Sequence, residues 1–249
     1  MKNSVRFASV AFALVAGPAM AADMPVKAPV YKAPAVVAAY NWTGFYIGGN
    51  VGYGWARGSS DIVTFFDPPG VPVGSIPGES TRLNGIIGGG QAGYNIQFNN
   101  IVWGLEGDIS GTGIKGSVTS PVFGYTATSN IEWLATGRGR LGVAFDRTLV
   151  YATGGVAVGS VKNTLDDVYG ATIVTTTSTT THVGWTVGAG VESALSFSPN
   201  WTVRVEYLYV DLGKKQNNHY EPSPPGWPQI SYESKVTANI ARVGFNYKF

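Results

Sequence analysis

The chain has 249 residues, with 17 basic and 15 acidic side chains and no cysteine. The near balance of charge leaves no basic patch for nucleic acid, and the absence of cysteine rules out disulfides as a support for the fold. Glycine is abundant, aromatic residues make up 12% of the chain, and long amphipathic helical patterns are missing. This composition favours a protein of many strands over a helical or α/β protein.

The first 22 residues are typical of a secretory signal peptide. Lys2 and Arg6 precede the apolar residues 7–16, and Ala19-Met20-Ala21 supplies the small residues that a signal peptidase reads. We expect cleavage directly after this motif or one residue later. Because no later segment approaches the roughly 20 apolar residues of a spanning helix, the mature protein is expected to be either soluble and exported or inserted as a closed barrel.

Residues 23–40 form a segment rich in proline, alanine, valine and lysine. Pro25, Pro29 and Pro34 recur at a density that favours extended polyproline II and discourages a packed core. We interpret the segment as a periplasmic spacer. A contact with peptidoglycan or another envelope component is the alternative interpretation.

Residues 41–249 contain eight segments in which apolar and polar residues alternate. A two-residue period indicates a strand with two unlike faces. The apolar positions run from Phe45 to Trp55, Ile86 to Phe98, Ile101 to Ile109, Ile131 to Phe145, Val183 to Val191, Trp201 to Tyr209 and Ala241 to Phe249, and the segment at 149–160 is apolar on both parities. The orientation of that one segment stays open.

The connections between these segments alternate in length. Tight turns are predicted at Asn99-Asn100, Asp146-Arg147-Thr148 and Ser198-Pro199-Asn200, and long loops at 57–81, 111–130, 162–180 and 214–230. Short periplasmic turns that alternate with long outer loops are typical of a transmembrane barrel with an even number of strands. Both termini would then lie in the periplasm. The first and last loops contain so much proline that we do not expect them to extend the sheet.

Two observations favour a lipid-facing rather than a core-facing apolar parity. The polar parity consists mostly of small residues, which suit a narrow lumen, and aromatic residues such as Trp103, Tyr151 and Trp185 gather near strand ends, where interfacial girdles would lie. The sequence therefore predicts an all-β fold, an eight-stranded antiparallel transmembrane β-barrel with an up-and-down meander. We expect it in the outer membrane of a Gram-negative cell, in contact with lipid and lipopolysaccharide.

Most of the charged residues on the polar parity lie four to eight residues from the nearest predicted turn or chain end, so they should meet at one level inside the barrel. These are Glu106, Asp108, Arg138, Arg140, Glu192, Arg204, Glu206 and Arg242. Four acids and four arginines could neutralise one another in a low-dielectric lumen, because the planar guanidinium can bond two carboxylates. We predict a plug that fixes the fold; a gated ion path is the alternative.

Three sequence stretches resemble a known family. They are Asn-Trp-Thr-Gly-Phe-Tyr-Ile-Gly-Gly at 41–49, Tyr-Ala-Thr-Gly-Gly-Val-Ala at 151–157 and Arg-Val-Gly-Phe-Asn-Tyr-Lys-Phe at 242–249. The chain resembles the RopB-type, porin-like outer-membrane immunogenic proteins of alphaproteobacteria over nearly its whole mature length. The resemblance implies an OmpA/OmpX-like eight-stranded barrel whose terminal Phe249 is read by the barrel-assembly machinery. Some relatives bind haem or host surfaces, but no residue motif here carries those activities over.

Other motif matches carry little weight. The glycine patterns that begin at Gly88 and Gly111 lack the strand–turn–helix context of a dinucleotide site. No spacing joins His182 or His219 to a nearby acid as a catalytic pair. We therefore expect no enzyme activity, no cofactor and no metal. The predicted role is structural, in envelope integrity and at the surface; the alternatives are a narrow low-conductance channel, or a binder of haem or host surfaces through the long loops.

Overall fold

The computed structural model describes residues 40–66, 71–76, 80–120, 125–169, 172–219 and 229–249. The predicted signal peptide lies outside the described residues, as does the predicted spacer apart from Tyr40. The described ranges contain nine strands: β1 (Gly44–Phe66), β2 (Val71–Ile76), β3 (Ser80–Phe98), β4 (Ile101–Ser120), β5 (Tyr125–Phe145), β6 (Thr148–Tyr169), β7 (Thr172–Leu195), β8 (Ser198–His219) and β9 (Gln229–Lys248). Within these ranges no helix is long and apolar enough to cross a membrane.

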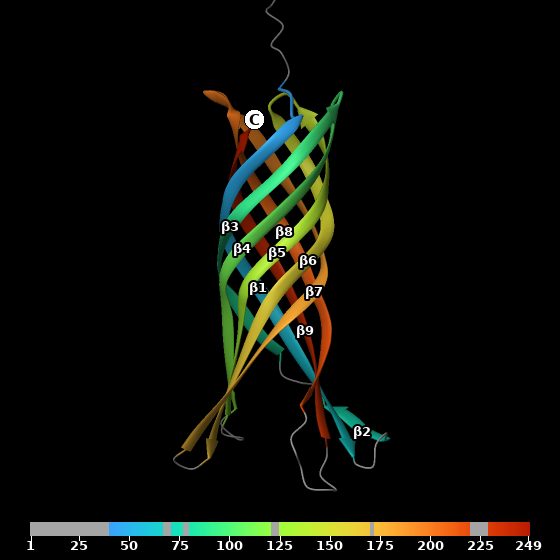
Figure 1. The fold of residues 1–249 in the computed structure, drawn as a ribbon, viewed down its shortest axis with the longest axis vertical. Coiled ribbons are helices and arrows are strands. Elements are labelled where there is room, and N and C mark those ends of the chain that lie inside the picture. The colour runs from blue at the N-terminus through green and yellow to red at the C-terminus, as the bar shows by residue number, and fades with distance from the viewer. Residues whose placement is uncertain (1–39, 67–70, 77–79, 121–124, 170–171, 220–228) are drawn as a thin grey trace, which may run out of the picture. The chain divides into compact units, whose positions relative to one another are not determined.

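Eight of the nine described strands form a closed ring (Figure 1). Each strand from β3 to β8 pairs antiparallel with the next, and β1 pairs with β3. The ring closes where β1 pairs with β9 from Tyr46↔Lys248 to Phe65↔Gln229. The ninth strand, β2, folds back on the far part of β1. The predicted eight-stranded antiparallel meander is confirmed.

One end of the ring carries the tight connections, and we call it the turn end. Turns lie at Asn99-Asn100 and Asp146-Arg147, where Asn99 and Asp146 have φ of 54° and 51°, a left-handed conformation that Asn and Asp tolerate. The third turn is Ser196-Phe197 and not the predicted Ser198-Pro199-Asn200. Proline is accommodated there because β8 begins with a register irregularity, a place where a strand needs no regular ladder hydrogen bond.

The opposite end, which we call the extension end, differs from the predicted long loops. The eight ring strands run for 19 to 24 residues, about twice the 9–11 residues that a membrane crossing requires. Much of 57–81, 111–130, 162–180 and 214–230 is therefore paired strand. Pro72 lies in β2, opposite Phe65 at a register shift, so proline here did not exclude pairing. Alternation failed as a signal because stretches such as Thr175–Thr181 are polar on both parities.

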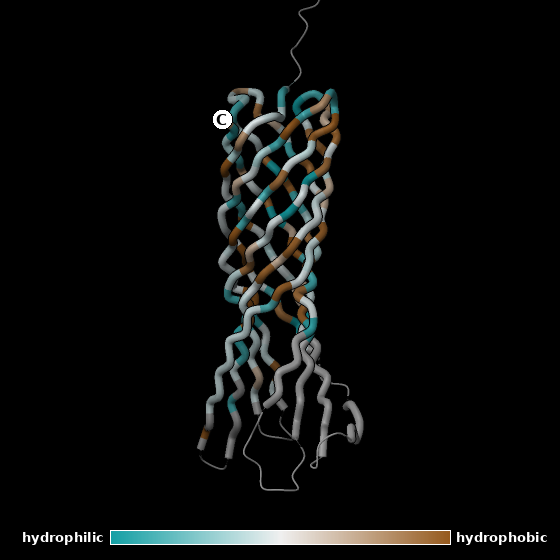
Figure 2. Tube along the Cα trace, turned by 45° about the vertical axis from the view of Figure 1, so that its right-hand side comes forward, coloured by the Kyte–Doolittle hydropathy of each residue, from teal (hydrophilic) through white to brown (hydrophobic). Residues whose placement is uncertain are grey.

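The two faces of the ring strands are as unlike as the alternation predicts. Leu105 on the outer face is 73% exposed, whereas its neighbour Glu106 is 4% exposed, and hydropathy alternates along the ring strands (Figure 2). The alternation does not orient β6, and the structure turns its Leu149 and Tyr151 inward, so Tyr151 does not belong to an aromatic girdle on the outer face.

A β-bulge between Ile131 and Trp133 changes which face of β5 one further residue occupies. Ile131 was predicted on the outer parity and is buried. Because the extra residue of a bulge reverses the alternation, strand parity on either side of it cannot be read as one series.

Candidate functional site in the barrel interior

The eight charged residues predicted at one level meet inside the ring, and we call them the charge belt. They come from β4 (Glu106, Asp108), β5 (Arg138, Arg140), β7 (Glu192), β8 (Arg204, Glu206) and β9 (Arg242). Each is at most 7% exposed. Strand register places opposite charges directly across from each other in three pairs, Glu106↔Arg138, Glu192↔Arg204 and Glu206↔Arg242.

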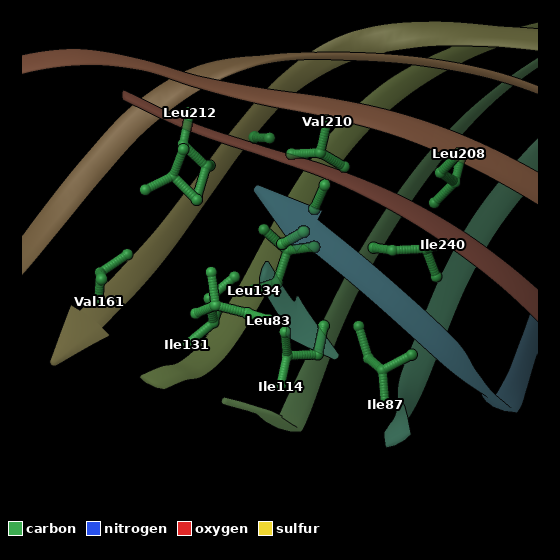
Figure 3. Packing of buried hydrophobic residues seen from close by; sticks show 14 residues of the cluster. Leu83, Ile87, Ile114, Ile131, Leu134, Val161, Leu208, Val210, Leu212 and Ile240 are labelled. Carbon is green, nitrogen blue, oxygen red and sulfur yellow. The ribbon is translucent and has the colours of Figure 1, made fainter. Parts of the chain in front are cut away.

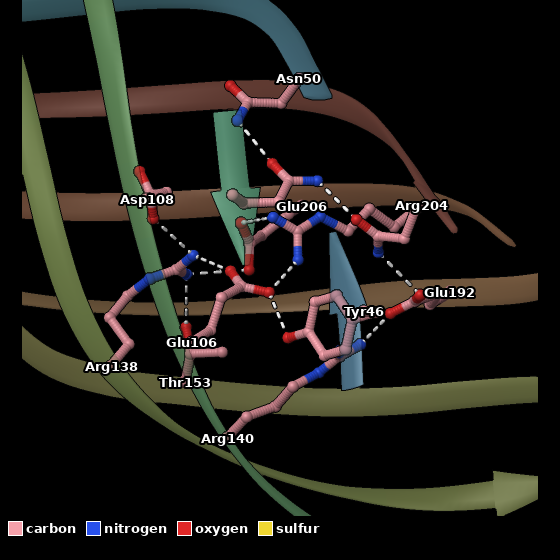
Figure 4. Close-up of polar contacts among 12 residues, drawn as sticks. Tyr46, Asn50, Glu106, Asp108, Arg138, Arg140, Thr153, Glu192, Arg204 and Glu206 are labelled. Carbon is pink, nitrogen blue, oxygen red and sulfur yellow. Dashed lines mark hydrogen bonds and ion pairs between the residues drawn. The ribbon is translucent and has the colours of Figure 1, made fainter. Parts of the chain in front are cut away.

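Arg138 lies at the centre of the charge belt and binds three acids (Figure 4). Its Nη1 lies 2.9 Å from Glu206 Oε1, its Nη2 lies 3.0 Å from Asp108 Oδ2, and Nη2 also pairs with Glu106. The Nε–H donates to the hydroxyl of Thr136 at 2.9 Å. The fork of the guanidinium thus ties β5 to β4 and β8 at once.

Arg242 and Arg204 complete the same network from β9 and β8. The Nε of Arg242 donates to Glu206 Oε2 at 2.8 Å, and its Nη1 lies 3.1 Å from Asp108 Oδ1. Arg204 pairs with Glu106, which also accepts a hydrogen bond of 2.6 Å from the hydroxyl of Tyr46 on β1. Side chains from distant parts of the sequence are therefore held in one ionic cluster.

Arg140 and Glu192 form a separate pair closer to the turn end. The guanidinium carbon of Arg140 lies 3.7 Å from the ring centre of Tyr151, a cation–π arrangement. Glu192 also accepts from the hydroxyl of Thr202 and, at 2.9 Å, from the amide of Asn246. The carboxylate is therefore bound from three sides, as a buried charge requires.

An amide network, which the sequence did not predict, continues the charge belt. The amide of Asn50 donates to Gln91 at 2.6 Å, and the amide of Gln91 donates to Asn246 at 2.7 Å, which in turn reaches Glu192. These residues share the inward parity of the arginines, which was the available signal. Charge alone does not reveal them, because Asn50, Gln91 and Asn246 are neutral.

Inward-facing glycines make the room that the belt occupies. A Cβ at Gly244 would lie 3.0 Å from Nε of Arg204 and 3.1 Å from the amide nitrogen of Gln91, and one at Gly93 would overlap the ring of Tyr46. An eight-stranded ring is only wide enough for side chains. The glycines on the inward parity therefore allow long arginines to cross the lumen.

The turn end of the interior is closed by a second layer, the mouth cluster, formed by Trp42, Val102, Leu149 and Tyr151. Trp42 precedes β1, is 1% exposed and donates its backbone N–H to Oε1 of Gln97 at 2.8 Å. Tyr40 packs edge-on against Trp42 with ring centres 4.8 Å apart. Burial, and then the negative charge of Glu192, raise the pKa of the Tyr40 hydroxyl to about 12.

A third layer fills the interior on the other side of the belt, and we call it the apolar cluster (Figure 3). Its members are Ala56, Leu83, Ile87, Ile114, Ile131, Leu134, Ala157, Val161, Leu208, Val210, Leu212, Val236, Ala238 and Ile240. Sequence reasoning missed this layer, although the signal was present. Along β8 the inward parity continues from Glu206 to Leu208 and Val210, so it changes from charged to apolar.

The layers can hold the barrel closed but offer no evident reaction chemistry. Among the described residues no group of three or more His, Cys, Asp or Glu could hold a metal ion. His182 is buried inside the ring, and His219 ends β8. Asp211 pairs with Lys235, and Asp166 accepts from Thr175.

Phe249 lies at the turn end of the seam between β1 and β9. Its N–H donates to the carbonyl of Phe45 at 3.0 Å, and its ring centre lies 5.7 Å from that of Phe45 and 5.2 Å from that of Tyr247. Phe249 as a whole is 65% exposed. This location is compatible with a strand-end signal, and the assembly role remains a prediction.

The chain is similar to known outer-membrane proteins over nearly its whole length. Residues 7–249 match the family described as outer membrane protein beta-barrel domain. The 31 kDa outer-membrane immunogenic protein of Brucella melitensis is 40% identical over 252 residues, which cover 99% of this chain and 100% of that protein. The 25 kDa outer-membrane immunogenic protein of Brucella abortus is 31% identical over 98% of this chain and 92% of that protein.

Two further proteins are similar. The 22 kDa outer membrane protein of Rhizobium leguminosarum is 31% identical over 84% of this chain and 79% of that protein. The crystal structure of the outer membrane protein OprG from Pseudomonas aeruginosa has a TM-score of 0.50 and 14% identity, over 85% of this chain and 98% of that chain. The second similarity concerns the fold alone.

Proposed function

The chain belongs to the family of outer membrane protein β-barrel domains, and from this premise we propose that it is a structural and surface protein whose barrel is closed from within. The observation that carries the proposal is the stack of three layers inside the ring: the mouth cluster, the charge belt and the apolar cluster. Such a barrel contributes to envelope integrity by its stability and by the strands that it extends beyond the membrane. The role is not enzymatic.

The apolar cluster is the layer that opposes ion passage most. An ion that enters it loses its hydration shell and meets Leu208, Val210 and Ile240, which offer no replacement ligands. Hydrophobic constrictions of this kind exclude water as well. The charge belt adds no driving force for one sign of ion, since its four acids and four arginines balance.

The proposed orientation places the turn end in the periplasm and the extension end outside the cell. Tight turns are expected on the periplasmic side, and residues 41 and 249 lie near one another at that end, linked by the pairing of β1 with β9. Aromatic side chains are exposed toward both ends of the outer face: Phe45, Phe98, Trp103, Phe145, Trp201 and Phe249 toward the turn end, and Tyr53, Trp55, Trp185 and Tyr207 farther along the strands. They would rest at the two interfaces with lipid and lipopolysaccharide.

Two further contacts belong to this proposal. The barrel-assembly machinery would recognise Phe249, which is exposed and therefore accessible to a partner. The proline-rich spacer, residues 23–40, would reach toward the peptidoglycan from the periplasmic end of the barrel. Both follow from the orientation above.

Planar-bilayer recording of the refolded protein tests the closed barrel. We expect no steady conductance from the wild type, and a measurable one from the double variant Leu208→Ser, Ile240→Ser, because hydroxyl groups would let water into the apolar cluster. Matched outward substitutions, Leu105→Ser and Val243→Ser, should leave the recording silent, since both side chains are exposed on the outer face. Steady wild-type conductance would favour the narrow channel. Tight, saturable haem binding in a titration would favour the surface binder.

A further inference from the structure

The outer face of the ring carries an apolar groove where β3, β4, β5 and β6 run side by side. Its volume is about 550 Å³, within the roughly 300–1,000 Å³ of small-molecule sites. Exposed side chains of Tyr94, Trp103, Leu105 and Leu141 line it. The floor of the groove is bare backbone, because the residue paired with Leu105 on β5 is Gly139, and the residue paired with Gly139 on β6 is Gly154.

The two glycines of this floor are not required by the fold. A Cβ at Gly139 would find its nearest atom, the carbonyl oxygen of Gly154, at 3.8 Å, and one at Gly154 would meet Val187 at 3.8 Å. Both are ordinary van der Waals distances. By contrast, a Cβ at the adjacent Gly155 would overlap the backbone of Gly137 inside the sheet. Glycine in a strand costs stability, and since internal packing does not demand it at Gly139 or Gly154, the backbone there is open to close approach from outside, beside the large side chains that line the groove.

We propose that this groove binds one hydrocarbon chain of a phospholipid. The groove is continuous with the exposed apolar surface that faces lipid in an outer-membrane barrel. A linear chain laid over Gly139 and Gly154 would contact backbone below and the side chains of Trp103 and Leu141 beside it. Because the groove surrounds a hydrocarbon chain with protein atoms on several sides, it makes more van der Waals contacts with the chain than the flat remainder of the surface does, and the residence time of the lipid is longer.

The size of the groove disfavours a second copy of the barrel as its occupant. Eleven residues line it, against the roughly 20–30 residues a side of a stable protein–protein interface. The position of the groove along the strands indicates which membrane leaflet it faces. Trp103 lies three residues from the turn at Asn99-Asn100, and Leu141 five residues from Asp146. The groove therefore lies in the periplasmic leaflet, where phospholipid is the available lipid; this assignment rests on the proposed orientation.

Native mass spectrometry of the refolded barrel, titrated with palmitoyl-oleoyl phosphatidylethanolamine, tests the proposal. We expect one lipid to be retained per barrel, and Gly139→Val to weaken its binding by about tenfold or more, because the new side chain occupies the floor. The matched control is Gly90→Val. Gly90 is also exposed on the outer face, its Cβ would likewise find a backbone oxygen at 3.8 Å, and it does not line the groove.

Each other outcome overturns part of the inference. Equal binding by the wild type, Gly139→Val and Gly90→Val would remove the groove as a lipid site. A dimer that only Gly139→Val abolishes would make the groove an interface between copies. Retention of lipopolysaccharide in preference to phosphatidylethanolamine would overturn the periplasmic leaflet. None of these outcomes affects the closed barrel, which the conductance recording tests separately.

Discussion

The charge belt and the apolar cluster are built on the same strands, and yet they hold the ring in different ways. On β8, Arg204 and Glu206 belong to the belt, while Leu208 and Val210, at the next inward positions, belong to the cluster. The belt is a set of directional pairs in which each charge depends on particular partners. The cluster is a non-directional filling whose contribution scales with buried area.

This difference has a consequence for register. Glu106↔Arg138 and Glu206↔Arg242 stand opposite each other only in the observed pairing, and a slip of one strand by one residue would turn the charges of that strand toward lipid. Apolar side chains of similar volume substitute for one another at modest cost. We hypothesise that the belt specifies the arrangement of the strands and that the cluster supplies stability. Variants in each region can separate the two contributions.

Removal of Arg138 should have the largest effect on stability. Arg138→Ala removes the guanidinium that binds Glu106, Asp108 and Glu206 and leaves these three acids with only two arginines, Arg204 and Arg242. Breaking a buried ionic pair typically costs on the order of 3–5 kcal/mol. The measurement is a urea titration of the refolded barrel followed by tryptophan fluorescence. Arg138→Lys should recover part of the loss, since lysine keeps the charge but cannot bind two carboxylates with one planar fork. A loss below about 1 kcal/mol for Arg138→Ala would mean that the acids find other partners or water.

Truncation in the apolar cluster should cost somewhat less. Leu208→Ala creates a cavity at a fully buried position, and such changes cost about 2–5 kcal/mol depending on how far the site collapses. The matched control is Leu105→Ala, at the outward position that is 73% exposed, which we expect to change the midpoint little. If both variants unfold at the same urea concentration, the apolar cluster is not a packed core.

The sequence predicts those parts of the arrangement in which the lipid and the lumen require different residue types. Outward parity was correct for Trp103, Leu105 and Val243 because lipid and lumen impose opposite preferences at every second position. The charge belt was predictable because a charged residue on the inward parity has no other favourable place. Ile131 failed because a bulge reverses parity, and nothing in the residue types marks a bulge.

The unpredicted parts share a different cause. Leu208 and Ile240 look the same whether they face lipid or a lumen, so only parity continuity with Glu206 and Arg242 reveals that they point inward. The strand extensions give no clear strand signal, because stretches such as Thr175–Thr181 are polar on both parities and the first and last extensions lie in proline-rich segments. Backbone pairing, however, needs no alternation. Trp42 precedes the first alternating segment, and its entry into the mouth depends on tertiary contacts such as the one to Gln97.

Deletion of Phe249 should lower stability less than either interior truncation. Phe249 is 65% exposed, and its ring contacts those of Phe45 and Tyr247. Such aromatic pairs are worth about 0.5–1.5 kcal/mol each. Cellular assembly should suffer more than stability, with less protein in the outer membrane and more precursor in the periplasm. Phe249→Tyr, which keeps an aromatic end, serves as the control. Normal insertion of the deletion variant would contradict the assembly role.

The smallest effect is expected at Lys235, an ionic contact outside the belt. Its Nζ lies 3.4 Å from Asp211 Oδ2, and the lysine side chain is 42% exposed, so solvent screens the pair. Asp211 keeps another donor, the N–H of Gly213 at 2.8 Å. Lys214 stands opposite Lys235 across β8 and β9, and its repulsion would be relieved.

The lost ion pair with Asp211 and the relieved repulsion from Lys214 oppose each other, so we expect Lys235→Ala to change the free energy of unfolding by about 0–1 kcal/mol in the same urea titration. The comparison with Arg138→Ala is the sharpest test of the belt, since each variant deletes one cation that is paired with acid. The two sites differ in burial and in the number of acids bound, three at Arg138 and one at Lys235. If the two variants lose stability equally, the acids around Arg138 are hydrated in solution, and the ring is wet where the structure has it closed.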